Sequence, residues 1–177
     1  MQIIKVVTGL LDENCYVLKK DNKVLVVDPG DDYPLIKEAI GGDKVVGILI
    51  THGHGDHVGA LRNFLTNKKM KIFKHSSTEE KEYDVDGFKF EVIKTPGHSK
   101  DSICFYFKDS SSMFVGDFIF KDSIGRWDLP GGDKNEMYES IERMKSYPDD
   151  IILYIGHGED SRLGYEKENN KYFNTKK

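Results

Sequence analysis

The chain has 177 residues, of which 38% are hydrophobic and 32% are charged, a balance typical of a globular rather than a disordered protein. Its 26 basic and 30 acidic residues give a net charge of −4, so charge gives no reason to expect a nucleic-acid partner. Because no apolar run is long enough to cross a bilayer, we also expect no membrane partner. The length fits one domain over residues 1–177.

Two features predict a cytoplasmic protein. The first residues, Met1–Val7, lack the basic start, the longer apolar stretch and the cleavage site of a signal peptide. The two cysteines, Cys15 and Cys104, both lie in apolar, strand-like runs. We interpret them as buried free thiols in a reducing compartment, with a disulfide as the alternative.

Short runs rich in Val, Ile and Tyr, separated by turn residues, predict β-strands. The predicted strands are Ile3–Val7, Cys15–Lys19, Val24–Asp28, Val45–Thr51, Met70–Phe73, Phe88–Thr95, Ser102–Phe107, Ser112–Gly116 and Ile151–Ile155. The predicted helices are Pro34–Ile40, Val58–Leu65, Asp133–Tyr147 and Leu163–Phe173. In the third helix we expect Asp133 to be the N-cap and Glu136 to complete a capping box. Strands with helices between and after them favour two sheets with helices outside.

The stretch Thr51-His52-Gly53-His54-Gly55-Asp56-His57 carries the main chemical signal. Four side chains that can bind a metal fall within six residues, directly after a predicted buried strand. Glycines at alternate positions let the backbone fold tightly, so that these side chains converge. Imidazole and carboxylate groups together suit zinc, iron or manganese. Three of the six histidines crowd here, and chance is a poor explanation of that density.

Three further polar residues share one placement, beside a glycine at the end of an apolar run: His98, Asp117 and His157. Strand ends are where a rigid scaffold presents residues to a site. Each of these residues alone would be typical of a hydrogen-bonding loop position. Together they leave only His75 outside the pattern, and we interpret His75 as a surface residue.

The order His52-x-His54-x-Asp56-His57, then His98, Asp117 and His157, resembles the metallo-β-lactamase superfamily over nearly the whole chain. The resemblance implies an α/β fold, the four-layer αββα sandwich, with the metals at one edge. It implies that one metal ion is held by His52, His54 and His98. It implies that a second ion is held by Asp56, His57 and His157, and that Asp117 bridges the two. The expected cofactors are two divalent ions, zinc first, with iron or manganese as alternatives.

Four shorter motifs are similar to glyoxalase II, the hydroxyacylglutathione hydrolases: Asn14-Cys15-Tyr16, Asp28-Pro29-Gly30, Thr95-Pro96-Gly97-His98-Ser99 and Gly116-Asp117. Ser123–Asp133 resembles the small single-domain branch, although Trp127 stands where that branch usually has Thr. The resemblance implies a thioesterase for small hydroxyacyl thioesters such as S-lactoylglutathione, with Asp56 and Asp117 as catalytic residues. Asp117 argues against a true β-lactamase. With 20 residues after His157, the helical domain that binds glutathione in full-length members has no counterpart.

Several interpretations stay open. Asp28 would either brace the His52–His57 loop or form a simple turn. Arg126 would either bind a substrate carboxylate or form an ion pair with Asp128 or Asp133. The pairs Lys68-Lys69 and Lys176-Lys177 are expected on the surface. The sequence predicts no oligomeric state.

Three rival functions share the fold. A persulfide dioxygenase would use a single iron held by His52, His98 and Asp117. A lactonase would use the same two-metal site, and a non-catalytic metal-binding protein would have lost a ligand. The complete ligand set favours hydrolysis, in which two metal ions lower the pKa of water from 15.7 to about 7 and polarise the substrate carbonyl.

Overall fold

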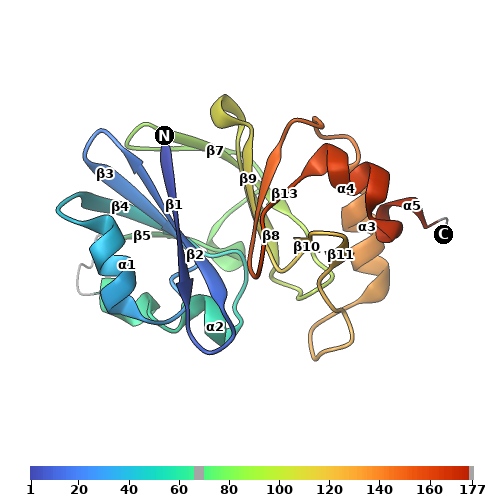
Figure 1. Cartoon of the computed structure of the whole chain (residues 1–177), viewed down its shortest axis with the longest axis horizontal. Helices are drawn as coiled ribbons and strands as arrows, with labels where there is room; N and C mark the ends of the chain where they lie inside the picture. The colour runs from blue at the N-terminus through green and yellow to red at the C-terminus, as the bar shows by residue number, and fades with distance from the viewer. Residues whose placement is uncertain (66–69, 176–177) are drawn as a thin grey trace.

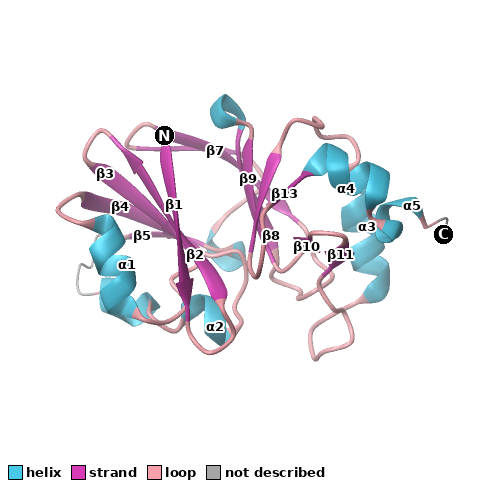
Figure 2. Cartoon of the chain, viewed as in Figure 1, coloured by secondary structure: helices cyan, strands magenta, loops and turns pink. Residues whose placement is uncertain are grey.

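The computed structural model describes residues 1–65 and 70–175 and contains two β-sheets packed face to face, with helices on the outer faces (Figures 1 and 2). This confirms the predicted αββα sandwich. The predicted surface lysines Lys68, Lys69, Lys176 and Lys177 lie outside the described residues. No helix in the described ranges is long and apolar enough to cross a membrane.

The first sheet has the strand order β1-β2-β3-β4-β5. Its strands are β1 (Gln2–Thr8), β2 (Glu13–Lys20), β3 (Lys23–Val27), β4 (Lys44–Leu49) and β5 (Lys71–Phe73). The pairs β1–β2 and β2–β3 are antiparallel, whereas β3–β4 and β4–β5 are parallel. On the outer side of this sheet lie α1 (Tyr33–Ile40), α2 (Gly55–Val58) and the 3₁₀ turn η1 (Leu61–Phe64).

The second sheet has the strand order β13-β12-β9-β8-β7-β6. Its strands are β6 (Glu82–Val85), β7 (Phe88–Lys94), β8 (Ile103–Phe107), β9 (Ser112–Gly116), β12 (Ile152–Ile155) and β13 (Ser161–Arg162). A small hairpin of β10 (Ile119–Phe120) and β11 (Ser123–Ile124) follows β9. The outer helices are α3 (Lys134–Met144), α4 (Leu163–Asn169) and α5 (Lys171–Asn174). Two 3₁₀ turns, η2 (His75–Ser77) and η3 (Lys108–Ser110), complete the elements.

The core between the sheets follows from the alternation of side chains along the strands. In β3, Leu25 and Val27 point between the sheets, whereas Val24 and Val26 pack under α1. Both faces of β2 and β3 are therefore covered, which explains why these strands read as continuous apolar runs. Phe105 and Phe114 of the second sheet fill the same central layer.

All nine predicted strands coincide with observed strands, but the predicted helix Val58–Leu65 is wrong. α2 ends at Val58 and η1 begins at Leu61. The Ala60 N–H donates to the carbonyl oxygens of Pro29 and Gly30, at 3.0 and 2.7 Å, instead of continuing the helix. A Cβ at Gly59 would clash with the Gly30 oxygen. The close turn at residues 29–30 thus divides the predicted helix.

The predicted helix Leu163–Phe173 is also divided, at Asn170, whose backbone is extended. The Asn170 side chain donates to Glu166 Oε2 at 2.7 Å and to the Ser123 oxygen at 2.9 Å. It also accepts a hydrogen bond from the Tyr172 N–H. These long-range bonds stabilise the break, and periodicity alone could not predict them.

In α3, Asp133 is the N-cap as predicted and accepts hydrogen bonds from the N–H groups of Asn135 and Glu136. The predicted return bond of the capping box is absent among the described contacts. The Asp133 N–H donates instead to the Gly97 carbonyl oxygen at 2.8 Å. This contact ties the start of α3 to the loop that carries His98.

The central layer should be sensitive to truncation. Leu49, which is fully buried between the sheets, should lose about 2–5 kcal/mol of unfolding free energy when replaced by Ala. The matched control is Leu35→Ala on α1, where the side chain is 47% exposed and a change within about 0.5 kcal/mol is expected. Urea unfolding measures both, and equal losses would contradict the assignment of the core.

Candidate metal centre

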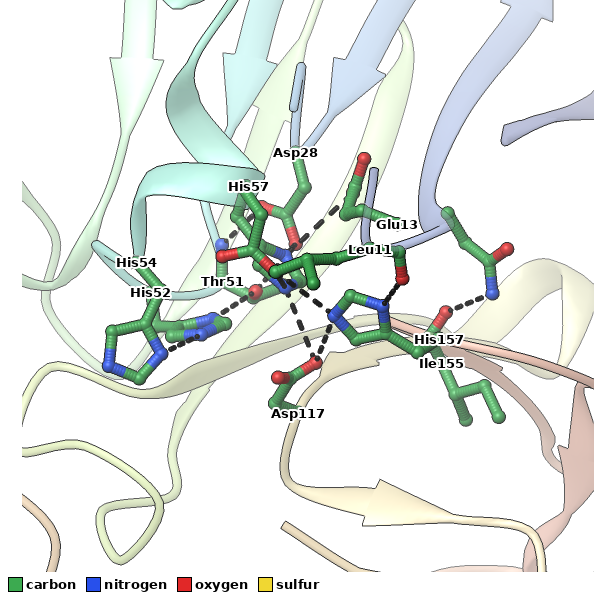
Figure 3. Close-up of polar contacts among 12 residues, drawn as sticks. Leu11, Glu13, Asp28, Thr51, His52, His54, His57, Asp117, Ile155 and His157 are labelled. Carbon is green, nitrogen blue, oxygen red and sulfur yellow. Dashed lines mark hydrogen bonds and ion pairs between the residues drawn. The ribbon is translucent and has the colours of Figure 1, made fainter. Parts of the chain in front are cut away.

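Segments from the two sheets meet at one edge of the sandwich and bring together the seven residues predicted as metal ligands. The segment after β4, which includes α2, supplies four of them, and the loops after β7, β9 and β12 supply one each. Figure 3 labels His52, His54, His57, Asp117 and His157 among them. We call this set the His/Asp cluster: His52, His54, Asp56, His57, His98, Asp117 and His157.

One half of the cluster consists of three imidazole rings. His54 Nδ1 lies 3.0 Å from His52 Nε2 and 3.0 Å from His98 Nε2. His98 Nδ1 donates a hydrogen bond to the Arg126 carbonyl oxygen at 2.8 Å. A neutral imidazole carries only one N–H, so this bond leaves His98 Nε2 with a lone pair directed at the other two rings. Three ring nitrogens facing one point match a metal site better than a hydrogen-bond network.

The other half consists of Asp56, His57 and His157. Asp56 Oδ2 lies 3.2 Å from His157 Nε2 and 3.8 Å from His57 Nε2. His157 Nδ1 donates to the Leu11 carbonyl oxygen at 2.9 Å, and His57 Nδ1 donates to Asp28 Oδ2 at 3.0 Å. Both Nε2 atoms therefore face the carboxylate of Asp56.

Asp117 lies between the two halves (Figure 3). Its Oδ1 is 3.3 Å from His57 Nε2 and 3.6 Å from His157 Nε2. Its Oδ2 is 3.6 Å from His98 Nε2. One carboxylate thus presents an oxygen to each half, which is the placement required of a bridging ligand.

Two atoms at the middle of the cluster test whether metal ions fit. His57 Nε2 and Asp117 Oδ1 are buried and have no hydrogen-bond partner. Leaving such a group unsatisfied costs about 1–3 kcal/mol. A divalent cation would satisfy both atoms, and a mixed set of nitrogen and oxygen donors suits zinc, iron or manganese. The residues present therefore fit two metal ions.

Burial and the neighbouring charges set the protonation of the cluster. Burial lowers the pKa of His52 to about 2 and also lowers the pKa of His98. Burial opposes ionisation of Asp117, but His57 outweighs it and holds that pKa at about 2. Burial likewise lowers the pKa of His57, yet Asp117 and Asp28 raise it to about 11. A metal ion binding to His57 therefore displaces a proton.

Asp28 braces the cluster from behind, which decides between the two interpretations of this residue. Its Oδ1 accepts a hydrogen bond from the Thr51 N–H at 2.7 Å, and its Oδ2 accepts one from Thr51 Oγ1 at 2.6 Å. The same Oδ2 accepts the hydrogen bond from His57. The side chain thus orients both the start of the ligand loop and one imidazole ring.

Sequence reasoning missed Glu13. It is buried, its Oε2 accepts a hydrogen bond from Thr8 Oγ1 at 2.8 Å, and its Oε1 lies 3.8 Å from His57 Nδ1 without a hydrogen-bond partner. Burial, followed by the charge of Asp28, raises the pKa of Glu13 to about 9. Its backbone forms a β-bridge with His157. A charged residue directly before the apolar run of β2 was the available signal.

The remaining predictions have mixed outcomes. Arg126 forms an ion pair with Asp128 through Nε–Oδ1 and Nη2–Oδ2, at 2.8 and 2.9 Å, whereas Asp133 caps α3. His75 is partly exposed in η2 and belongs to none of the described groups able to hold a metal. Cys15 and Cys104 are buried and free, as predicted.

A cavity of about 620 Å³ opens beside the cluster. Its lining residues come from the cluster segments and from three others, the β1–β2 turn, β10 and the loop before α3. They are Leu11, His54, Gly55, Asp56, His98, Asp117, Phe120, Arg126, Leu129 and His157.

Comparison with known proteins identifies the family. The model of the metallo-beta-lactamase superfamily matches residues 8–83 and 76–157. The chain belongs to this superfamily. It is 32% identical to the hydroxyacylglutathione hydrolase GloC of Haemophilus influenzae, over 93% of this chain and 94% of that protein.

Two solved structures are similar to this chain over nearly their whole length. The B3 metallo-beta-lactamase BLEG-1 superposes with a TM-score of 0.92 at 27% identity, covering 98% of this chain and 100% of that one. TTHA1623, crystallised in a di-iron-bound form, superposes with a TM-score of 0.85 at 28% identity, covering 96% of this chain and 99% of that one.

Removing the brace should weaken metal binding without unfolding the protein. Asp28 has a positive φ of 46°, which Asn tolerates, so Asp28→Asn keeps the backbone but turns an acceptor into a donor. We expect metal affinity to fall about 10–100-fold, measured by competition with a chromophoric chelator. Asp21→Asn, at a φ of 52° in the exposed β2–β3 turn, is the control. Unchanged affinity in Asp28→Asn would contradict the bracing role.

Proposed function

We propose that this protein is a dinuclear metal hydrolase that cleaves small hydroxyacyl thioesters, of which S-lactoylglutathione is the test case. The observation that carries the proposal is the position of Asp117, which faces both halves of the His/Asp cluster. A site for one ion would need only one of these halves. The similarity to the hydroxyacylglutathione hydrolase GloC supports the choice of a thioester.

In this proposal His52, His54 and His98 hold one ion, Asp56, His57 and His157 hold the other, and Asp117 bridges them. Zinc is the first candidate because mixed His and carboxylate sites are common for it. Iron and manganese accept the same ligands, and TTHA1623 was crystallised with two irons. Elemental analysis of the purified protein distinguishes zinc, iron and manganese.

When bound, the ions would supply a nucleophilic water at neutral pH and polarise the thioester carbonyl. Asp56 and Asp117 both line the cavity, where their oxygens accept hydrogen bonds from the attacking water and orient it. The water adds to the carbonyl carbon, the C–S bond breaks, and a carboxylic acid and a thiol are released. Cys15 and Cys104 take no part, because both are fully buried and burial raises the pKa of each thiol.

The length of the chain does not argue against this function. GloC carries the name hydroxyacylglutathione hydrolase and is spanned over 94% of its length by this chain. A helical domain after the catalytic domain is therefore not required for a protein of that name.

The test must distinguish thioester hydrolysis from two other functions, β-lactam hydrolysis and persulfide dioxygenation. The similarity to BLEG-1 over the full length of both chains favours β-lactam hydrolysis as the second candidate. A persulfide dioxygenase would use iron at His52, His98 and Asp117 alone. Asp56, His57 and His157 would then bind no metal, and the buried Nε2 of His57 would have no partner. A lactonase or a non-catalytic metal-binding protein is a weaker alternative.

The test combines elemental analysis with an assay of thiol release from S-lactoylglutathione. We expect two metal ions per chain and metal-dependent thiol release. His54→Ala should lower kcat/KM by at least about 100-fold, because a ligand facing the reaction centre is lost. His75→Ala is the matched control, since His75 lies outside the cluster, and its activity should be unchanged.

Three outcomes would overturn the proposal. One iron per chain, oxygen uptake with glutathione persulfide and no thiol release would identify a dioxygenase. Hydrolysis of nitrocefin without hydrolysis of any thioester would identify a β-lactamase. Equal losses in His54→Ala and His75→Ala would show that the cluster is not the reaction centre.

A further inference from the structure

Three apolar side chains from separate segments line the same cavity as the His/Asp cluster. Leu11 comes from the β1–β2 turn, Phe120 from β10 and Leu129 from the loop before α3. Leu11 is 66% exposed and Leu129 is 37% exposed. Apolar groups left open to solvent beside a few convergent polar groups are typical of a ligand-binding cavity. We call these three side chains the apolar wall.

The apolar wall is held in place by the cluster and by packing. The Leu11 carbonyl oxygen accepts the hydrogen bond from His157 Nδ1, as Figure 3 shows. The Phe120 ring lies with its centroid 6.3 Å from that of the His157 ring. The backbone of Leu11 and the ring of Phe120 thus lie beside a proposed metal ligand, so the wall borders the proposed reaction centre.

Trp127 anchors the segment that carries the third wall residue. Its ring centroid lies 6.2 Å from that of Tyr138 on α3 and 6.1 Å from that of Tyr172 on α5. The Gly132 N–H donates to the Leu129 carbonyl oxygen at 2.9 Å and closes the turn. This loop therefore presents Leu129 to the cavity from a packed base.

The cavity offers few charged side chains that could bind the peptide part of glutathione. Arg126 is the only Lys or Arg among the described lining residues, and two of its nitrogens are engaged by Asp128. Asp56 and Asp117 also line the cavity, but as proposed metal ligands they have their charge offset by the ions. Glutathione carries two carboxylates and one ammonium group, so its peptide part would find a single cationic side chain among these lining residues, and that side chain is already paired.

We infer that the cavity selects thioesters by an apolar substituent packed against Leu11, Phe120 and Leu129, and that it does not recognise the peptide part of glutathione. This inference rests on the proposed thioester hydrolysis. S-Lactoylglutathione is then turned over because of its thioester bond alone. The apolar substituent belongs either to the acyl group or to the thiol, and the two sources can be separated by experiment.

The experiment uses the metal-loaded full chain and two series of thioesters. The acyl series consists of acetyl, butyryl and hexanoyl thioesters of N-acetylcysteamine. The thiol series consists of lactoyl thioesters of N-acetylcysteamine, ethanethiol, butanethiol and glutathione. We expect kcat/KM to rise about threefold per methylene in one series. The lactoyl thioesters of glutathione and N-acetylcysteamine should differ by less than about threefold, since neither carrier is recognised.

Variants of the wall test its role. Leu11→Ser and Leu129→Ser should flatten the dependence of kcat/KM on chain length, because the apolar contact that favours the longer chains is lost. Leu10→Ser is the matched control: Leu10 is fully exposed in the same turn and does not line the cavity. A second readout needs no turnover. S-Butyl-N-acetylcysteamine, a thioether, should bind more tightly than its S-methyl analogue by calorimetry, and Leu11→Ser should remove the difference.

The outcomes distinguish a failure of the apolar selectivity from a failure of the proposed thioester hydrolysis. Thioester hydrolysis with no gain from longer chains, or with glutathione favoured more than tenfold over N-acetylcysteamine, would overturn the inference and leave the proposed function standing. No hydrolysis of any thioester would overturn the proposed function itself. A chain-length dependence unchanged in Leu11→Ser and Leu129→Ser would overturn the assignment to the apolar wall.

Discussion

In four of the five histidines of the cluster, one ring nitrogen faces away from the centre of the cluster. A contact at that nitrogen fixes the orientation of the ring. The partners are Thr51 Oγ1 for His52, Asp28 for His57, the Arg126 carbonyl oxygen for His98 and the Leu11 carbonyl oxygen for His157. These contacts set which nitrogen carries the proton and therefore which nitrogen is free to bind. The sandwich makes these contacts possible, because the histidines and their partners come from both sheets and must meet at one edge.

The geometry of the cluster in turn depends on the hydrogen bonds that join the two sheets. Asn14 N–H donates to the Gly156 oxygen at 2.7 Å, and its side chain donates to the Ile155 oxygen at 2.9 Å. These bonds join β2 of the first sheet to the end of β12 in the second, next to His157. The packing of the two sheets therefore determines how closely His98, Asp117 and His157 approach the cluster residues that follow β4. Asp117, which faces both halves, can act as a bridge only if that packing is rigid.

The residues of the His/Asp cluster could be predicted from the sequence to lie together because their signal is local. His52 to His57 are crowded into one loop, and His98, Asp117 and His157 each follow an apolar run. Nine strands were predictable for the same reason. Glu13 and the Leu11 carbonyl were not, because their roles depend on contacts across more than 40 residues with His57 and His157. The break at Asn170 likewise depends on Ser123, far away in the chain.

The departure at Trp127 has a structural explanation. An indole ring in this position reaches Tyr138 and Tyr172 on two different helices, which a threonine could not do. The ring anchors the loop that carries Arg126 and Leu129 on the outer helices. The outer helical layer is thereby connected to the cavity wall, so that part of the substrate surface depends on packing remote from the metal centre.

If the two halves of the cluster hold two metal ions bridged by Asp117, crystals of the metal-loaded protein should reveal both ions by anomalous diffraction recorded on both sides of the absorption edge of the metal. We expect two anomalous peaks about 3.5–4 Å apart, one among His52, His54 and His98 and one among Asp56, His57 and His157, with Asp117 between them. A single peak at full metal loading, or a peak outside the cluster, would contradict this two-metal site.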